Sequence, residues 1–235
     1  MQANKNGFFY VLDRQTGEFL SGKPFVPVNW ASGLDGKGRA LENASALYGN
    51  KPAFVAPAPA GGHNWQPVSF NPDSKIIYIP AQDSAQPFVG SHGGDIHLGG
   101  WNTGVDFGGI AKLAEAAAAA GTPAPPRVGE LLAWDVVNQK EVWRVKHPTF
   151  WNGGTLVTAG NLVFQGLGDG TFNAWSADKG EKVWKRLRLT WFPCPRRSCR
   201  AGSFHHRLLG LLRVDTAKHP RRLWKRLRRS CSWEQ

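Results

Sequence analysis

The stretch AWDVVNQKEVW, residues 133–143, returns 41 residues later as AWSADKGEKVW, residues 174–184. A weaker copy, VLDRQTGEF, occupies residues 11–19, where Gly17 matches Gly180 but no Trp follows. A period near 40 in β-type sequence is typical of propeller blades that have four strands each. The repeat therefore predicts an all-β fold that forms part of a β-propeller.

Each repeat unit has the pattern of a β-hairpin. A strand ends at Ala-x-Asp, residues 178–180 form a turn, and Val183 and Trp184 begin the next strand. The Trp side chain is large and flat enough to fill the space between neighbouring sheets. A second turn, at residues 168–170, separates strands at 162–165 and 171–175. Its Gly-x-Gly-x-Gly pattern does not indicate a nucleotide-binding loop, because a strand follows it and not a helix.

Another strand is expected at residues 75–80, after which residues 82–129 interrupt the repeat. Within this insertion we expect an irregular glycine-rich loop, a short helix over Ala111–Ala120, and a proline-rich connector at residues 122–127. An insertion of this kind is more often a surface excursion than a functional lid.

The charge of the chain changes sharply near Trp184. Residues 1–184 hold 14 Lys and Arg against 15 Asp and Glu, whereas residues 185–235 hold 15 Lys and Arg against two acidic residues. All three cysteines also fall after residue 184. We therefore divide the chain into a β-sheet region, residues 1–184, and a basic tail, residues 185–235.

Several interpretations of the tail remain open. Its Lys and Arg residues could bind nucleic acid or an acidic membrane surface, with Leu223, Trp224 and Leu227 on one helical face. Cys194, Cys199 and the histidines after them lack the paired spacing of a zinc site. We interpret the tail as aberrant or disordered sequence from out-of-frame translation, with no specific nucleic-acid partner. No stretch of the chain has the roughly 20 apolar residues of a membrane span, and no secretion signal opens it.

Four segments carry a resemblance to a known family. They are NKNGFFYVLDR at residues 4–14, GKPFVPVNW at 22–30, GGHNW at 61–65, and WNGGTLVTAGNLVFQG at 151–166. Together they resemble the pyrroloquinoline-quinone-dependent alcohol dehydrogenases of the methanol and ethanol type. The resemblance covers residues 1–184. It implies an eight-bladed propeller that holds the quinone and a calcium ion in its central channel. It also implies oxidation of small primary alcohols in the periplasm, with electrons passed to a cytochrome c or to haem.

The resemblance assigns four residues to the cofactor pocket. Lys5 matches the basic residue at the carbonyl oxygens of the quinone, and Asn64 and Trp65 match the pair at its polar edge. Trp151 resembles the Trp whose ring lies close under the quinone. A fixed cation favours the reduced quinone, an amide binds polar atoms, and aromatic rings offer apolar surface to a planar heterocycle. Without the resemblance, these residues would be a solvated Lys, a turn Asn and two packing Trp side chains.

The resemblance also implies what this chain does not carry. In the family, the general-base Asp, the calcium ligands, a disulfide of adjacent cysteines and the ring-stacking Trp precede the position of Lys5. No catalytic or metal-binding residue is therefore assigned, no haem-binding motif follows Trp184, and Met1 is expected to be an internal methionine. We expect a part of an alcohol dehydrogenase that is inactive alone. The alternatives are a non-enzymatic propeller module for protein interactions and a nucleic-acid-binding protein that acts through the tail.

Overall fold

The structure is a computed structural model that describes residues 1–49, 51–91, 98–100, 102–122 and 127–186. Residues 1–189 group into one compact unit, which contains all of the described residues. The expectations for the tail beyond Arg186, including its helical face and its cysteines, lie outside the described residues. The expected irregular loop and the proline-rich connector also fall mostly outside them.

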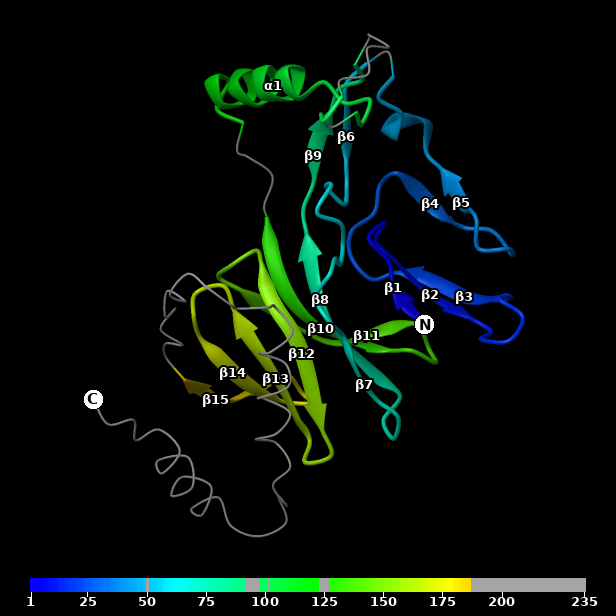
Figure 1. The fold of residues 1–235 in the computed structure, drawn as a ribbon, viewed down its shortest axis with the longest axis vertical. Coiled ribbons are helices and arrows are strands. Elements are labelled where there is room, and N and C mark those ends of the chain that lie inside the picture. Colours follow the sequence, from blue (N-terminus) through cyan, green and yellow to red (C-terminus); the bar gives the residue numbers. More distant parts are fainter. Residues whose placement is uncertain (50, 92–97, 101, 123–126, 187–235) are drawn as a thin grey trace. The chain divides into compact units, whose positions relative to one another are not determined.

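Antiparallel sheets dominate the described residues (Figure 1). The first sheet comprises β1 (Gln2–Ala3), β2 (Phe8–Leu12) and β3 (Phe19–Pro24). The second comprises, in chain order, β7 (Ser69–Asn71), β8 (Ile76–Asp83), β10 (Val128–Asp135) and β11 (Lys140–His147). The third comprises β12 (Asn152–Thr158), β13 (Leu162–Leu167), β14 (Phe172–Ser176) and β15 (Lys182–Arg186). Two smaller pairs are β4 (Ala31–Leu34) with β5 (Ala40–Glu42) and β6 (Ala53–Val55) with β9 (Gln86–Phe88), and Ala44–Ala46 form one 3-10 turn.

The repeat found in the sequence is confirmed as a structural repeat. Ala133 pairs with Trp143 across β10 and β11, and Ala174 pairs with Trp184 in the same way across β14 and β15. In both hairpins the register shifts directly after this alanine. Equal sequence thus forms an equal hairpin, and the two tryptophans occupy equivalent places in the second and third sheets.

Two apolar clusters hold the three sheets together, and both involve the second sheet. The cluster between the first and second sheets includes Phe9, Phe25 and Trp134. The cluster between the second and third sheets includes Trp143 and Trp175. Side chains that alternate along β8 and β10 supply both clusters, because successive residues of a strand point to opposite faces. The second sheet therefore lies between the other two.

The Trp143 side chain fills the space between the second and third sheets, as the repeat predicted for its Trp. The indole Nε1 of Trp143 donates a hydrogen bond of 2.9 Å to the backbone oxygen of Ala177. Its ring lies over Gly180, where a Cβ atom would come within 2.6 Å of the ring. Gly180 has a φ of +70°, so the turn needs glycine both for its backbone and for this close contact.

The contact between the first and second sheets uses a different pair at the same positions. Here Ser21 takes the place of the Trp, and Gln139 takes the place of the Gly at a φ of +53°. The Gln139 amide Nε2 donates a hydrogen bond of 3.1 Å to the Ser21 hydroxyl. In the Trp143–Gly180 pair the large residue is on the strand and the small one is on the turn. In the Ser21–Gln139 pair the small residue is on the strand and the large one is on the turn, so the space between the sheets is again filled.

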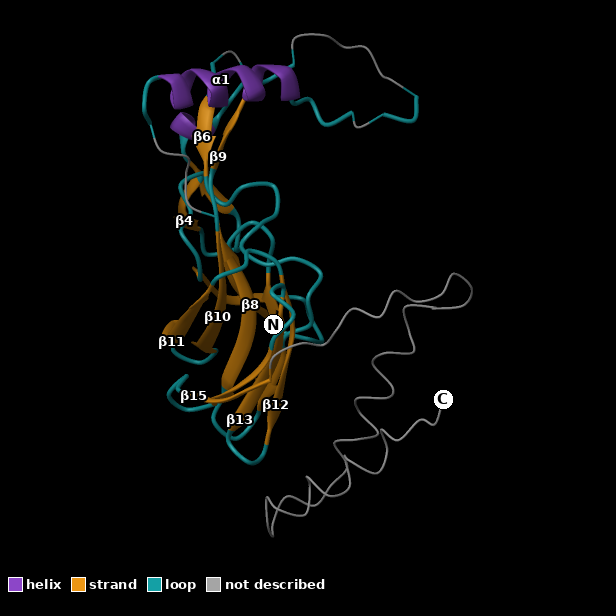
Figure 2. Ribbon diagram, turned by 90° about the vertical axis from the view of Figure 1, so that its left-hand side faces the viewer, coloured by secondary structure: helices purple, strands orange, loops and turns teal. Residues whose placement is uncertain are grey.

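Three boundaries differ from the expectation. β8 continues to Asp83 and β10 begins at Val128, so the interruption of the sheet is shorter than residues 82–129. β15 continues to Arg186, past the expected end of the β region at residue 184. The helix α1 spans Phe107–Ala119 and begins before Ala111, because the carboxylate of Asp106 caps it by accepting a hydrogen bond from the Gly109 N–H. Figure 2 shows α1 with β6 and β9 beyond the ends of β8 and β10.

The described residues contain no helix that is long and apolar enough to cross a membrane.

Candidate functional site

Lys5 and the loop of residues 61–65 lie side by side. Lys5 occupies the turn between β1 and β2, and its backbone oxygen accepts a hydrogen bond of 3.0 Å from the Gly62 N–H. A Cβ atom on Gly61, which has a φ of +83°, would overlap the Lys5 side chain. The two glycines before Asn64 therefore allow the loop to approach the lysine turn closely.

Trp151 lies at the same end of the sheets, which we call the site end. The Gln82 N–H at the end of β8 donates to the Gly62 oxygen at 2.8 Å, which ties the loop to the second sheet. Gly129, opposite Gln82 on β10, approaches the backbone of residues 149 and 150 so closely that a Cβ atom would not fit. Residue 151 follows directly and leads into β12 of the third sheet. One turn from each sheet thus carries a candidate residue at the site end.

The candidate side chains are open to a ligand. Lys5 is exposed, the Trp65 side chain is 72% exposed and that of Trp151 is 43% exposed. Asn64 is half-buried, and its Nδ2 donates a hydrogen bond of 2.8 Å to the Ala60 oxygen. Among the described residues, no hydrogen bond or ring contact joins Trp151 to the other three. The structure therefore brings together the Lys5 turn and the loop, and it places Trp151 at their end without contact.

Buried polar groups near this loop were not singled out from the sequence. His63 is buried, and its ring Nδ1 donates a hydrogen bond of 2.9 Å to the Pro80 oxygen. Burial lowers the pKa of His63, so the ring is neutral. The side-chain oxygen of Gln66 and both amide atoms of Gln82 are buried without a protein partner. Such atoms require water or a ligand, and their burial depends on strands distant in sequence, so no local pattern indicates it.

A second buried histidine supports the segment after Trp151. His147 Nε2 lies 3.0 Å from the side-chain oxygen of Gln165, whose Nε2 donates a hydrogen bond of 2.9 Å to the Gly153 oxygen. Burial lowers the pKa of His147 to about 4. The neutral ring therefore donates through Nε2, and this chain of hydrogen bonds fixes the start of β12.

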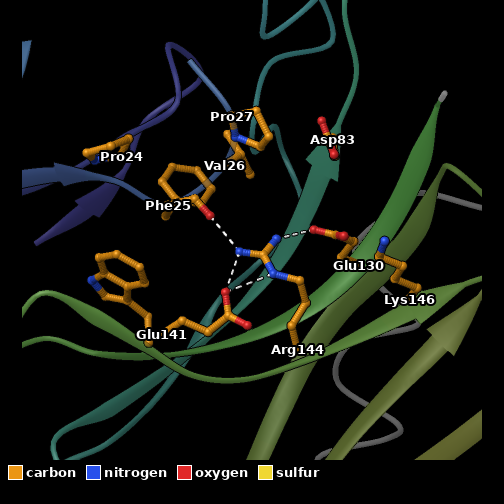
Figure 3. A pocket seen from close by; sticks show the side chains of 10 residues that line it. Pro24, Phe25, Val26, Pro27, Asp83, Glu130, Glu141, Arg144 and Lys146 are labelled. Carbon is orange, nitrogen blue, oxygen red and sulfur yellow. Dashed lines mark hydrogen bonds and ion pairs between the residues drawn. The ribbon is translucent and has the colours of Figure 1, made fainter. Parts of the chain in front are cut away.

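A hollow of about 380 Å³ at the contact between the first and second sheets is the other candidate region (Figure 3). Arg144 dominates it and forms ion pairs with Glu130 and Glu141. Its Nη2 also donates a hydrogen bond of 2.9 Å to the Phe25 oxygen. Burial alone would lower the pKa of Arg144, but the two carboxylates outweigh burial and raise it. Through these contacts Arg144 joins the first and second sheets. Because its charge is already neutralised by the two carboxylates, the hollow is the weaker candidate for a ligand site.

The described residues contain no group of three or more His, Cys, Asp and Glu side chains that could hold a metal ion. The donors at the site end suit an organic ligand. The Lys5 ammonium can bind an anionic or carbonyl oxygen, the Asn64 amide can bind polar atoms, and two open indole rings can contact a planar ring. The unpartnered side-chain oxygen of Gln66, which directly follows the loop, and the unpartnered amide of Gln82 lie beside the same loop. These residues fit a planar quinone.

No family model matches the chain. Curated relatives do. The quinohemoprotein alcohol dehydrogenase of Comamonas testosteroni is 46% identical over 194 residues, which cover 79% of this chain and 26% of the relative. The 1-butanol dehydrogenase (cytochrome c) of Thauera butanivorans is 40% identical over 196 residues, which cover 78% of this chain and 26% of the relative. The chain thus spans about a quarter of the length of these relatives.

Solved structures agree with the curated relatives. The crystal structure of the Comamonas testosteroni enzyme matches with a TM-score of 0.67 and 45% identity over 79% of this chain and 28% of that chain. A europium-containing methanol dehydrogenase matches with a TM-score of 0.63 and 25% identity, and the match covers 78% of this chain and 31% of that chain. The three sheets are therefore blades, and the fold is part of a β-propeller. The resemblance found in the sequence is confirmed: the chain belongs to the family of quinoprotein alcohol dehydrogenases.

Proposed function

We propose that the site end binds pyrroloquinoline quinone through Lys5, Asn64, Trp65 and Trp151. The observation that carries this proposal is the hydrogen bond between the Gly62 N–H and the Lys5 oxygen. It holds the turn with the cation against the loop with the amide and the indole. The quinone would supply the redox chemistry by accepting a hydride equivalent from an alcohol.

Each residue then has a role that its chemistry suits. The Lys5 ammonium would stabilise the charge that a quinone oxygen gains on reduction. The Asn64 amide, which is fixed by Ala60, would orient the polar edge of the ring. The exposed faces of Trp65 and Trp151 would lose water when a planar ring covers them, which favours binding.

The whole-protein function that we propose is oxidation of small primary alcohols to aldehydes by an enzyme of which this chain forms part. Calcium beside the quinone, electron transfer to a cytochrome c-type acceptor or to haem, and a periplasmic location belong to the same proposal. It is supported by the family and by the names of the relatives, which include a cytochrome c-linked butanol dehydrogenase and quinohemoproteins.

Replacing Lys5 with Ala tests the site directly. We expect the variant to bind pyrroloquinoline quinone about tenfold or more weakly, because a hydrogen bond to a charged group contributes roughly 1.5–3 kcal/mol. Quenching of indole fluorescence on titration with the quinone measures the affinity. Lys37→Ala is the matched control, because Lys37 lies on the exposed turn between β4 and β5 and should leave binding unchanged. Equal losses in both variants, or none in Lys5→Ala, would refute the assignment.

A further inference from the structure

Arg144 on β11 is fixed by two carboxylates of its own sheet and donates to the first sheet. Its Nε and Nη2 donate hydrogen bonds of 3.0 and 2.9 Å to one carboxylate oxygen of Glu141 on β11. Its Nη1 pairs with the buried carboxylate of Glu130 on β10. Nη2 donates a second hydrogen bond, of 2.9 Å, to the Phe25 oxygen (Figure 3). Because the guanidinium is planar, its two carboxylate partners also fix the direction of the bond to Phe25.

Phe25 connects Arg144 to the turn that carries Lys5. β3 ends one residue before Phe25, so the Phe25 oxygen lies outside the hydrogen bonds that pair β2 with β3. The N–H of Phe25 donates a hydrogen bond of 3.0 Å to the Gly7 oxygen. Gly7 in turn closes the Lys5 turn, because its N–H donates to the Asn4 oxygen at 3.1 Å. One buried residue thus stands between Arg144 and the Lys5 turn.

Phe25 also contacts the other part of the site end, the loop of residues 61–65. A Cβ atom on Gly62 would come within 2.5 Å of the Val26 side chain and 3.2 Å of the Phe25 ring. The backbone of the loop therefore packs directly on these two side chains at the point where the Gly62 N–H donates to the Lys5 oxygen. The position of Phe25 consequently affects both parts of the site end.

The two parts of the site end are tied to the second sheet separately. The loop is tied by the Gln82 N–H of β8, which donates to the Gly62 oxygen at 2.8 Å. The Lys5 turn is tied by Arg144 through Phe25. Loss of Arg144 would release the turn and leave the tie of the loop in place, so Lys5 could shift relative to Asn64.

We propose that Arg144 is a positioning residue for the quinone, which holds the Lys5 turn in register with the loop through Phe25. This inference rests on the proposed function, because it gives Arg144 a part in binding the same ligand. Arg144 acts on the ligand only through the Lys5 turn. Its effect on quinone affinity therefore depends on the presence of the Lys5 side chain.

A paired variant, Arg144→Met with Glu130→Leu, removes the guanidinium without leaving a buried charge unpaired. We expect it to bind pyrroloquinoline quinone about fivefold more weakly than the unchanged 235-residue chain, as measured by quenching of indole fluorescence. In the Lys5→Ala background the same pair should change the affinity by less than about twofold, because the turn then carries no group to misplace. A general loosening of the fold would weaken binding equally in both backgrounds.

Ser21→Ala is the matched control for a weaker contact between the first and second sheets. It removes the hydrogen bond from Gln139 at the same sheet contact but leaves the bonds of Phe25 in place, so the quinone affinity should not change. Circular dichroism establishes that each variant is folded. If the paired variant does not fold, Arg144→Lys replaces it. This variant keeps a cation beside Glu130 and should also lose affinity, because one ammonium does not reproduce the planar fork.

The possible outcomes separate this proposal from the proposed function. If Lys5→Ala loses affinity but the folded Arg144 variant does not, Arg144 has no positioning role and the proposed function stands. Equal losses in the two backgrounds, or an equal loss in Ser21→Ala, would overturn the positioning role in the same way. If the unchanged chain does not bind the quinone, the proposed function is refuted and the role of Arg144 with it.

Discussion

Two histidines at the site end are neutral because of where they are buried and not because of their neighbours in sequence. His63 donates to the Pro80 oxygen, and His147 bonds the side chain of Gln165. Their partners come from β8 and β13, so the burial that lowers each pKa arises only in the folded chain. Proton uptake by either ring therefore opposes folding.

Acidification is expected to destabilise the fold through His147. In the unfolded chain the pKa of His147 is near 6.5, and in the folded chain it is about 4. The unfolded state thus binds the proton more tightly. The contribution of His147 to the free energy of unfolding is complete above about pH 6.5 and is lost as the pH falls to about 4, by up to roughly 3 kcal/mol. Urea unfolding at pH 7 and pH 4 measures this loss.

The variant His147→Gln separates this effect from general acid unfolding. Glutamine can still donate to Gln165 but does not titrate, so the difference between the two pH values should shrink. An unchanged difference would show that other groups cause the acid sensitivity.

The sequence indicates some residues of the site end but not others. Lys5, Asn64 and Trp65 were singled out because short motifs carry them, and their turns do lie together. The buried amides of Gln66 and Gln82 were missed because nothing in their neighbours distinguishes a buried Gln from a solvated one. Trp151 was placed at the site end, but its distance from the other residues depends on how two sheets pack, which no local pattern encodes.

The hairpin repeat predicted the strands of the second and third sheets well, because turn residues and alternating apolar residues act locally. The repeat does not predict the contact between the first and second sheets, because no Trp stands at the equivalent position of the first sheet. Ser21 and Gln139 function as a complementary pair and resemble neither Trp143 nor Gly180. Burial at the start of β2 likewise depends on a residue distant in sequence. Phe8 is buried, and Trp30 meets its ring at 6.0 Å.

The two sheet contacts should differ in strength. Trp143→Ala removes a buried aromatic side chain and is expected to cost about 3–5 kcal/mol of the free energy of unfolding. Ser21→Ala at the equivalent position removes one half-buried hydrogen bond and is expected to cost about 1 kcal/mol. Urea unfolding of the two variants measures both values. Similar losses would mean that the Trp143 contact is not the stronger one.

At the scale of the molecule, the described residues form three blades, and the chain spans about a quarter of the length of its curated relatives. With added pyrroloquinoline quinone and calcium, we expect no oxidation of ethanol by the 235-residue chain. The described residues contain no group of three or more His, Cys, Asp and Glu side chains that could hold a metal ion beside the quinone, so the charge stabilisation that calcium would supply has no site among them. A dye-linked assay compares the chain with free quinone, and turnover above that background would contradict the expectation.

The exchange of large and small side chains between the two sheet contacts has a consequence for how the chain finds its fold. Repeats of similar sequence risk pairing with the wrong neighbour, and such misassembly is a common failure of repeat proteins. A blade that ends in Trp cannot settle on the turn that carries Gln139, and a blade that ends in Ser leaves a void over Gly180. At these two contacts, each sheet edge therefore fits its own neighbour better than it would fit the other one.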